Sequence, residues 1–256
     1  MKTSLSKVPE ATFVFWVIKI AATTLGETAG DALSMSMNLG YLLSSFIFAF
    51  IFVIAVTFQI KTKNFHAWIY WITIIATTTG GTTLADFADR SLGIGYTGGS
   101  SILLTFLLIS LSLWYHNLGS VSIHTVYSPK SESFYWITIM FSETLGTALG
   151  DWTADTEGFG YSGAAALFTG LLILLLALYY WTNISKSILF WSAFVLTRPL
   201  GAVVGDFLDK PLSDGGLALS RYMASFVLLA FIVGCLVVFN QKAATLKNNQ
   251  CDNAAL

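Results

Sequence analysis

The sequence predicts an all-α, polytopic membrane protein with eight transmembrane helices arranged as four parallel two-helix repeats. The prediction rests on composition, on eight long apolar stretches and on a fourfold repeat. Of the 256 residues, 55% are hydrophobic and 11% are charged, whereas about 25% are charged in ordinary soluble domains. The mean hydropathy of +0.71 also favours a chain that faces lipid. The net charge of -1 argues against nucleic acid as a partner, because nucleic-acid binding requires a basic surface.

Eight stretches are long and apolar enough for a spanning helix, which needs about 20 residues. They cover residues 11–30, 41–60, 66–88, 97–116, 133–151, 161–181, 187–207 and 216–239. The even-numbered stretches are uniformly apolar, which suits contact with lipid. The odd-numbered stretches carry threonine, glycine and carboxylates in their C-terminal halves, and these halves should face protein or water, since polar groups in hydrocarbon are costly. Charges inside the first stretch favour a retained helix over a cleaved signal peptide.

Four repeats align without gaps from the tryptophans Trp16, Trp71, Trp136 and Trp191. An aspartate follows fifteen residues later in each repeat: Asp31, Asp86, Asp151 and Asp206. Small residues follow after ten and fourteen positions: Gly26, Gly81, Gly146 and Gly201, then Gly30, Ala85, Gly150 and Gly205. We expect these glycines to let the odd helices pack backbone to backbone. The tryptophans are expected to lie in a belt at the membrane interface.

The spacing of the repeats divides the chain into two halves. The tryptophan origins are 55, 65 and 55 residues apart, so the middle interval holds ten extra residues. We therefore predict a first half over 1–118, a linker over 119–132, a second half over 133–242 and a polar tail over 243–256. Lysines concentrate at both ends of the chain and between repeats, which predicts that both termini, the tail included, are cytoplasmic. Arg90, Lys210 and Arg221 depart from this pattern.

Polar residues spaced four apart form a ladder on one face of each odd helix. In the first repeat the ladder is Lys19, Thr23, Glu27 and Asp31. Its counterparts are Thr78, Thr82 and Asp86; Glu143, Thr147 and Asp151; and Arg198, Ala202 and Asp206. If the four odd helices surround a common centre, these ladders face one another. We select as candidate transport and metal residues Glu27, Asp31, Asp86, Glu143, Asp151 and Asp206, with Thr23, Thr82, Thr147, Lys19 and Arg198 as auxiliary residues.

The charge of the ladders indicates a cation site. Six carboxylates face two basic residues, and four negative charges in excess cannot stay ionised in a low dielectric without cations, protons or water. Carboxylate and hydroxyl oxygens suit Mg²⁺, Ca²⁺ or Mn²⁺. The three histidines lie off the ladders, so a tight zinc or copper site is not expected. The alternative is structural: the aspartates cap helix ends or join the repeats, and Arg198 pairs with Glu143.

Two segments, Glu27-Thr-Ala-Gly-Asp31 and Glu143-Thr-Leu-Gly-Thr-Ala-Leu-Gly-Asp151, resemble motifs of a bacterial family of uncharacterised membrane-anchored proteins. The resemblance covers nearly the whole chain and implies a location in the bacterial inner membrane. A second, weaker resemblance is to Mn²⁺ and Ca²⁺ exporters that carry E-x-G-D-[KR]-[ST] on paired helices. Here the spacing is E-x-x-G-D, and Ala32 and Leu33 replace the basic and hydroxyl residues of that motif.

These observations predict a transporter of divalent metal cations, with Mn²⁺ favoured and proton exchange as its coupling. The alternative is a membrane scaffold or accessory subunit with structural polar contacts between helices. The sequence holds no nucleophile, nucleotide or histidine-rich metal motif, so we expect no enzyme activity and no cofactor apart from the transported ion. The expected partners are the lipid bilayer, metal cations and protons, and a homodimer is compatible with the repeats.

Overall fold

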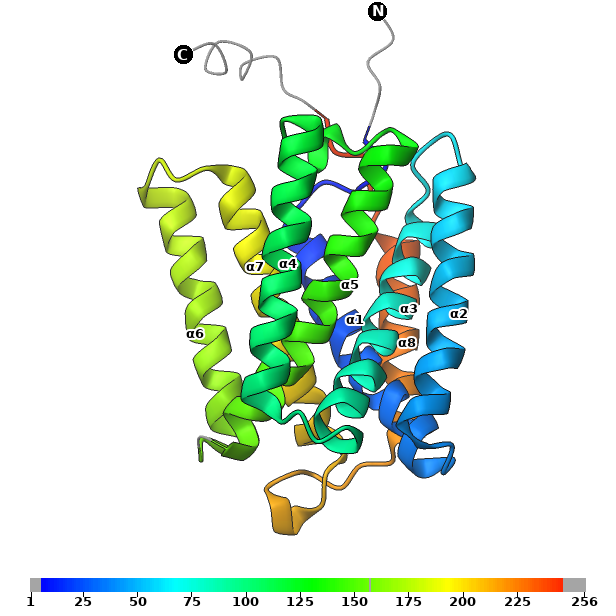
Figure 1. The fold of residues 1–256 in the computed structure, drawn as a ribbon, viewed down its shortest axis with the longest axis vertical. Helices are drawn as coiled ribbons and strands as arrows, with labels where there is room; N and C mark the ends of the chain where they lie inside the picture. The colour runs from blue at the N-terminus through cyan, green and yellow to red at the C-terminus, as the bar shows by residue number, and fades with distance from the viewer. Residues whose placement is uncertain (1–5, 157, 246–256) are drawn as a thin grey trace, which may run out of the picture.

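The computed structural model describes residues 6–156 and 158–245, and in this part the chain is all-α (Figure 1). Its α-helices are α1 (Phe13–Asp31), α2 (Gly40–Lys61), α3 (Ala67–Asp86), α4 (Tyr96–Leu118), α5 (Pro129–Asp151), α6 (Gly160–Trp181), α7 (Lys186–Asp209) and α8 (Arg221–Val238). Each corresponds to one predicted stretch, and α5 begins at Pro129, inside the predicted linker. Most of the predicted tail, residues 246–256, lies outside the described residues.

The four odd helices form a closed inner ring. Along this ring α1 packs on α3, α3 on α5, α5 on α7, and α7 again on α1. The even helices lie outside, and each covers the first helix of the next repeat: α2 packs on α3, α4 on α5, α6 on α7 and α8 on α1. The four repeats therefore run parallel around one axis, and the predicted fold class is confirmed.

The outer helices present the apolar surface of a multi-pass membrane protein. Within the described residues, α2, α4, α6, α7 and α8 are long and apolar enough to cross a membrane. Large apolar side chains of α2 illustrate the surface, since Phe46, Phe50 and Phe58 are 66%, 68% and 64% exposed. Together with the length and apolarity of these helices, such an exposed apolar surface favours contact with lipid. Of these five, α7 belongs to the inner ring together with the more polar helices α1, α3 and α5, and the even-numbered helices cover that ring.

Glycines of the repeated column lie where neighbouring inner helices approach most closely. A Cβ atom on Gly146 would lie 2.3 Å from Cγ of Arg198, and one on Gly201 would lie 2.5 Å from Cβ of Thr23. Likewise, a Cβ atom on Gly26 would lie 2.6 Å from Cγ2 of Thr78. Each glycine thus faces the residue seven positions after the tryptophan of the next repeat. The side chains of the ladders occupy the space that the missing Cβ atoms leave.

Aromatic side chains fill the end of the ring that carries the chain termini. Trp71, Trp136 and Trp191 are buried there at 0%, 2% and 5% exposure. The prediction of an interface belt is wrong for these three tryptophans, because the inner position of their helices directs them into the core. In the same layer, the hydroxyl groups of Tyr70 and Tyr135 form a hydrogen bond of 2.6 Å.

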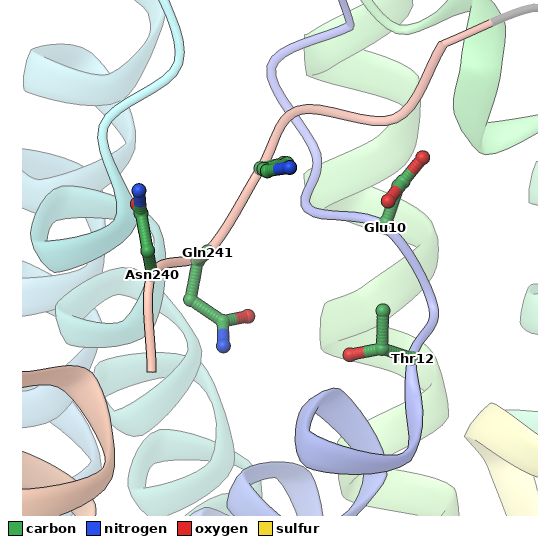
Figure 2. Close-up of a pocket in the computed structure, with 5 residues that line it drawn as sticks. Glu10, Thr12, Asn240 and Gln241 are labelled. Carbon is green, nitrogen blue, oxygen red and sulfur yellow. The ribbon is translucent and has the colours of Figure 1, made fainter. Parts of the chain in front are cut away.

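The described ends of the chain meet over this aromatic layer. Ala244 donates its backbone N–H to Val8 O at 2.8 Å, and the buried Lys7 pairs with Glu132 at 2.6 Å. Beside this contact lies a polar pocket of about 240 Å³. It is lined by Glu10, Thr12, Asn240, Gln241 and Lys242, of which Figure 2 labels the first four. The pocket lies at the opposite end of the inner helices from the repeated aspartates.

Candidate functional site

The four repeated aspartates lie together at the end of the inner ring remote from the termini. Asp31, Asp86, Asp151 and Asp206 are between 1% and 3% exposed. In the first three repeats the helix continues past the aspartate as a π-helical turn: η1 (Ala32–Ser36), η2 (Phe87–Ser91) and η4 (Trp152–Thr156). In the fourth, α7 itself continues to Asp209. The aspartates therefore do not cap terminal residues of their helices, and their carboxylates point into the bundle.

Two basic side chains divide the aspartate layer into pairs. Arg90 lies 3.1 Å from Oδ1 of Asp86 and 3.0 Å from Oδ2 of Asp151. Lys210 lies 2.9 Å from Oδ2 of Asp31 and 3.0 Å from Oδ1 of Asp206. Each base thus bridges the aspartate of its own repeat and that of the next repeat. The result is a twofold arrangement of charges on a fourfold arrangement of helices.

Both bridging bases lie just beyond the inner helices and remain charged. Burial lowers the pKa of Lys210, but Asp206 and Asp31 raise it more, so the pKa lies above its ordinary value. For Arg90, burial is likewise outweighed by Asp86 and Asp151, and its pKa is raised. Opposite charges at this range favour the charged form. Each base therefore supplies one positive charge to the aspartate layer.

Glu27 lies one helical turn deeper and connects the two pairs. Its carboxylate forms one group with Asp31 and Asp86, and a second group with Asp151 and Asp206. Within each group, one oxygen from every member lies within 4.8 Å of the others. Oxygens at this spacing can bind a common cation, because Mn²⁺ and Ca²⁺ are held by several oxygens at about 2–2.6 Å. Glu27 is 3% exposed, so such a cation would be enclosed.

Arg198 extends across the axis on the inner side of Glu27. Its Nη2 lies 3.0 Å from Oε2 of Glu27 and donates hydrogen bonds to the hydroxyls of Thr82 and Thr147. Its Nη1 donates to the carbonyl of Thr23 at 3.2 Å. The first three repeats thus hold the guanidinium of the fourth, and Arg198 is 0% exposed.

A second buried pair follows further toward the termini. Nζ of Lys19 donates to Oε1 of Glu143, and both side chains are fully buried. Oε2 of Glu143 lies 3.5 Å from Nε of Arg198, so the expected Arg198–Glu143 pair is present. Lys19 also lies over the ring of Phe194, 4.1 Å from its centroid. Glu143 therefore lies between two bases. Glu27, by contrast, pairs with Arg198 and lies close to four aspartates.

With every group counted as ionised, the six carboxylates and four bases of the axis give a formal net charge of minus two. The four bases are Lys19, Arg198, Arg90 and Lys210, whose ion pairs are described above. Arg221 also lies 3.6 Å from Oδ2 of Asp31, but it pairs more closely with Asp209, at 2.7 Å. Some oxygens of the aspartate layer have no partner among the described residues. Oδ2 of Asp86 and Oδ1 of Asp151 are buried without a hydrogen bond and without an ion pair. Buried carboxylate oxygens without donors are costly, so the layer favours the arrival of positive charge.

The structure brings all six predicted carboxylates to the axis, but the auxiliary residues behave differently. Thr82 and Thr147 contact Arg198, whereas the hydroxyl of Thr23 donates to backbone carbonyls, such as that of Ile20 at 2.8 Å. Sequence reasoning missed Arg90 and Lys210 as site residues and noted them only as departures from the distribution of basic residues. A signal was present, because both residues lie nineteen positions after their tryptophan and so extend the ladder by one further turn.

The comparisons with known proteins identify a repeat family. The chain belongs to the family described as Repeat of Unknown Function (DUF347), which matches residues 14–65, 69–118, 134–185 and 189–240. Each matched segment contains one inner helix and the outer helix that follows it. No match was found among the curated proteins or among the solved structures. The expected four repeats are thereby confirmed, while the likeness to Mn²⁺ and Ca²⁺ exporters stays a hypothesis.

Proposed function

We propose that this protein is a transporter of divalent metal cations, with Mn²⁺ as the favoured ion, and that Glu27 and the four repeated aspartates bind the ion. The observation that carries the proposal is the pair of carboxylate groups that share Glu27 and carry negative charge in excess. The proposed role is transport rather than catalysis. The proposed location is a bacterial inner membrane, with the termini cytoplasmic and the aspartate layer toward the outside.

The charge balance supports exchange against protons. Two excess negative charges are balanced by one divalent cation or by two protons. An ion that leaves can therefore be replaced by two protons without a change in net charge at the site, and clustered carboxylates have a raised affinity for protons. The oxygen-only ligand set favours Mn²⁺ over zinc or copper. It also favours Mn²⁺ over Mg²⁺, because Mg²⁺ gives up its water reluctantly.

The proposal is tested by flux in proteoliposomes that contain a metal-sensitive dye and a pH dye. We expect Mn²⁺ to cross the membrane in one direction and protons to cross in the other, so that the pH inside changes as Mn²⁺ moves. Asp151→Asn and Glu27→Gln should each reduce this flux at least tenfold. Asp155→Asn is the matched control, because this exposed residue lies one turn beyond Asp151 and accepts a hydrogen bond from Tyr96 at 3.1 Å. Its flux should equal that of the wild type.

Retained flux in Asp151→Asn would remove the aspartate layer from the transport path. No flux for any divalent ion, from folded and inserted protein, would favour the scaffold reading. That alternative has a specific observation behind it, since each of the six carboxylates already lies within ion-pair distance of Arg90, Lys210 or Arg198. It predicts that Glu27→Gln and Glu143→Gln lower stability without any ion-specific effect.

A further inference from the structure

The guanidinium of Arg198 occupies a position that is built like a cation site. Its neighbours are oxygens: one carboxylate oxygen of Glu27, the hydroxyls of Thr82 and Thr147, and the carbonyl of Thr23. The three side chains lie eleven residues after the tryptophans of the first three repeats, so they form one layer around the axis. In the fourth repeat this position is Ala202, whose methyl group is neither a donor nor an acceptor.

The neighbouring residues leave space for the side chain of Arg198 and bury its guanidinium away from solvent. Gly146 lies against the stem of Arg198, and a Cβ there would lie 2.4 Å from Cβ of Arg198. Thr82, Thr147 and Arg198 are all 0% exposed. A planar guanidinium presents several donors in a fixed geometry, and here these donors reach oxygens of α1, α3 and α5 at once.

We propose that this oxygen layer is a second cation-binding position on the axis, and that Arg198 fills it as a tethered monovalent cation. For the proposed transporter, on which this consequence rests, Arg198 is the barrier between the aspartate layer and the inner half of the bundle. A metal ion bound beside Glu27 meets the charge of Arg198 as the next cation on the axis. Further movement of the ion then requires Arg198 to leave its oxygens.

The position is tested by chemical rescue of Arg198→Ala. This variant leaves Glu27 and Glu143 without their shared base, and we expect its Tm to fall by at least about 6 °C. If the emptied layer binds cations, free guanidinium at millimolar concentration should raise that Tm by about 3 °C and then saturate. Tetramethylammonium at equal concentration, which is bulky and has no N–H donors, should give no rise.

Lys61→Ala is the control, because it removes one positive charge at an exposed residue at the end of α2. Lys61 lies at the surface and is not part of the layer of Glu27, Thr82 and Thr147, so added guanidinium should leave the Tm of this variant and of the wild type unchanged. Equal responses of Arg198→Ala to guanidinium and tetramethylammonium would overturn the proposal. An equal rise in Arg198→Ala and in Lys61→Ala would do so as well.

Failure of Arg198→Ala to fold also gives a result. Membranes that contain the variant are then solubilised with guanidinium or with tetramethylammonium, and folded protein is measured by size-exclusion chromatography. Recovery with guanidinium alone supports the position, whereas equal recovery or equal loss overturns it. The test is independent of transport: rescue in a protein that moves no divalent ion would keep the cation position and reject the proposed function.

Discussion

The two ends of the inner ring are built from the same four repeats but are held together by different forces. At the end with the termini, rings pack on rings, as between Tyr70 and Trp136, whose centroids are 5.6 Å apart. At the opposite end, Arg90 and Lys210 bridge pairs of aspartates. The aromatic end is neutral, whereas the aspartate end lies in the half of the axis with negative charge in excess. Substitutions at the first end should therefore change stability, and those at the second should change the response to ions.

The largest expected effect is at the aromatic end. Trp136→Ala removes a side chain that is 2% exposed, and we expect unfolding free energy to fall by about 3–5 kcal/mol, as for other buried large-to-small changes. Thermal unfolding followed by circular dichroism measures the loss. Trp181→Ala is the control, since Trp181 is 84% exposed and its replacement should change the Tm little. A loss below about 1 kcal/mol for Trp136→Ala would contradict the packed end.

Both ends depend on the same close spacing of the inner helices, and Gly146→Ala should loosen it. The added Cβ would collide with the stem of Arg198, and overpacking of this kind costs about 1–3 kcal/mol. Gly170→Ala in α6 is the control, because a Cβ there meets nothing within 4 Å and alanine favours the helix by up to about 1 kcal/mol. If Gly146→Ala is as stable as Gly170→Ala, the helices are not in the close contact described.

Removal of one bridging base should raise the affinity of the aspartate end for metal. In Arg90→Gln, Asp86 and Asp151 lose their common base, so the negative excess on the axis grows by one charge. We expect Mn²⁺ to bind about tenfold more tightly, which corresponds to about 1.4 kcal/mol. Isothermal titration with Mn²⁺ measures the change. Lys61→Gln, at an exposed position at the end of α2, should bind as the wild type does, and weaker binding by Arg90→Gln would contradict the proposed ion site.

The smallest expected effect separates the two ends most directly. Tyr70→Phe removes the hydrogen bond to Tyr135 and should cost about 0.5–1.5 kcal/mol, with Mn²⁺ affinity unchanged. The exposed Tyr180, at 73% exposure, provides the control Tyr180→Phe. A clear change in Mn²⁺ affinity of Tyr70→Phe would show that the aromatic layer and the aspartate layer are coupled.

The helices of this fold could be predicted from sequence because lipid imposes length and apolarity on them. The stretch predicted at 161–181, for example, corresponds to α6 over Gly160–Trp181. The order of packing could not be predicted, since nothing in one repeat shows that α2 covers α3 rather than α1. The burial of the tryptophans could not be predicted for the same reason. Trp71 is of a residue type common at membrane interfaces, and it is buried because it lies on an inner helix.

The four aspartates of the axis were predictable because they share one position in the aligned repeat, and the two glutamates because they lie four and eight residues before an aspartate on the same helix face. Their partners were harder to predict. Arg90 and Lys210 follow the predicted helix ends, where charges usually face water, and the π-helical turn η2 that brings Arg90 back toward Asp86 has no clear sequence signal. The pairing across repeats, such as Arg90 with Asp151, depends on the ring itself. The excess of four negative charges expected from the sequence is therefore two in the structure.

The circular packing of the outer helices has a consequence for biosynthesis. α1 is made first, yet the helix that covers it from outside, α8, is made last. During most of synthesis α1 also lacks α5 and α7, which carry the partners of Lys19 and Glu27. Charged groups without partners are expensive in hydrocarbon. The young chain therefore needs shelter at the insertion machinery until α7 closes the inner ring and α8 covers α1. Truncation before α8 should leave a product that is degraded rather than stored.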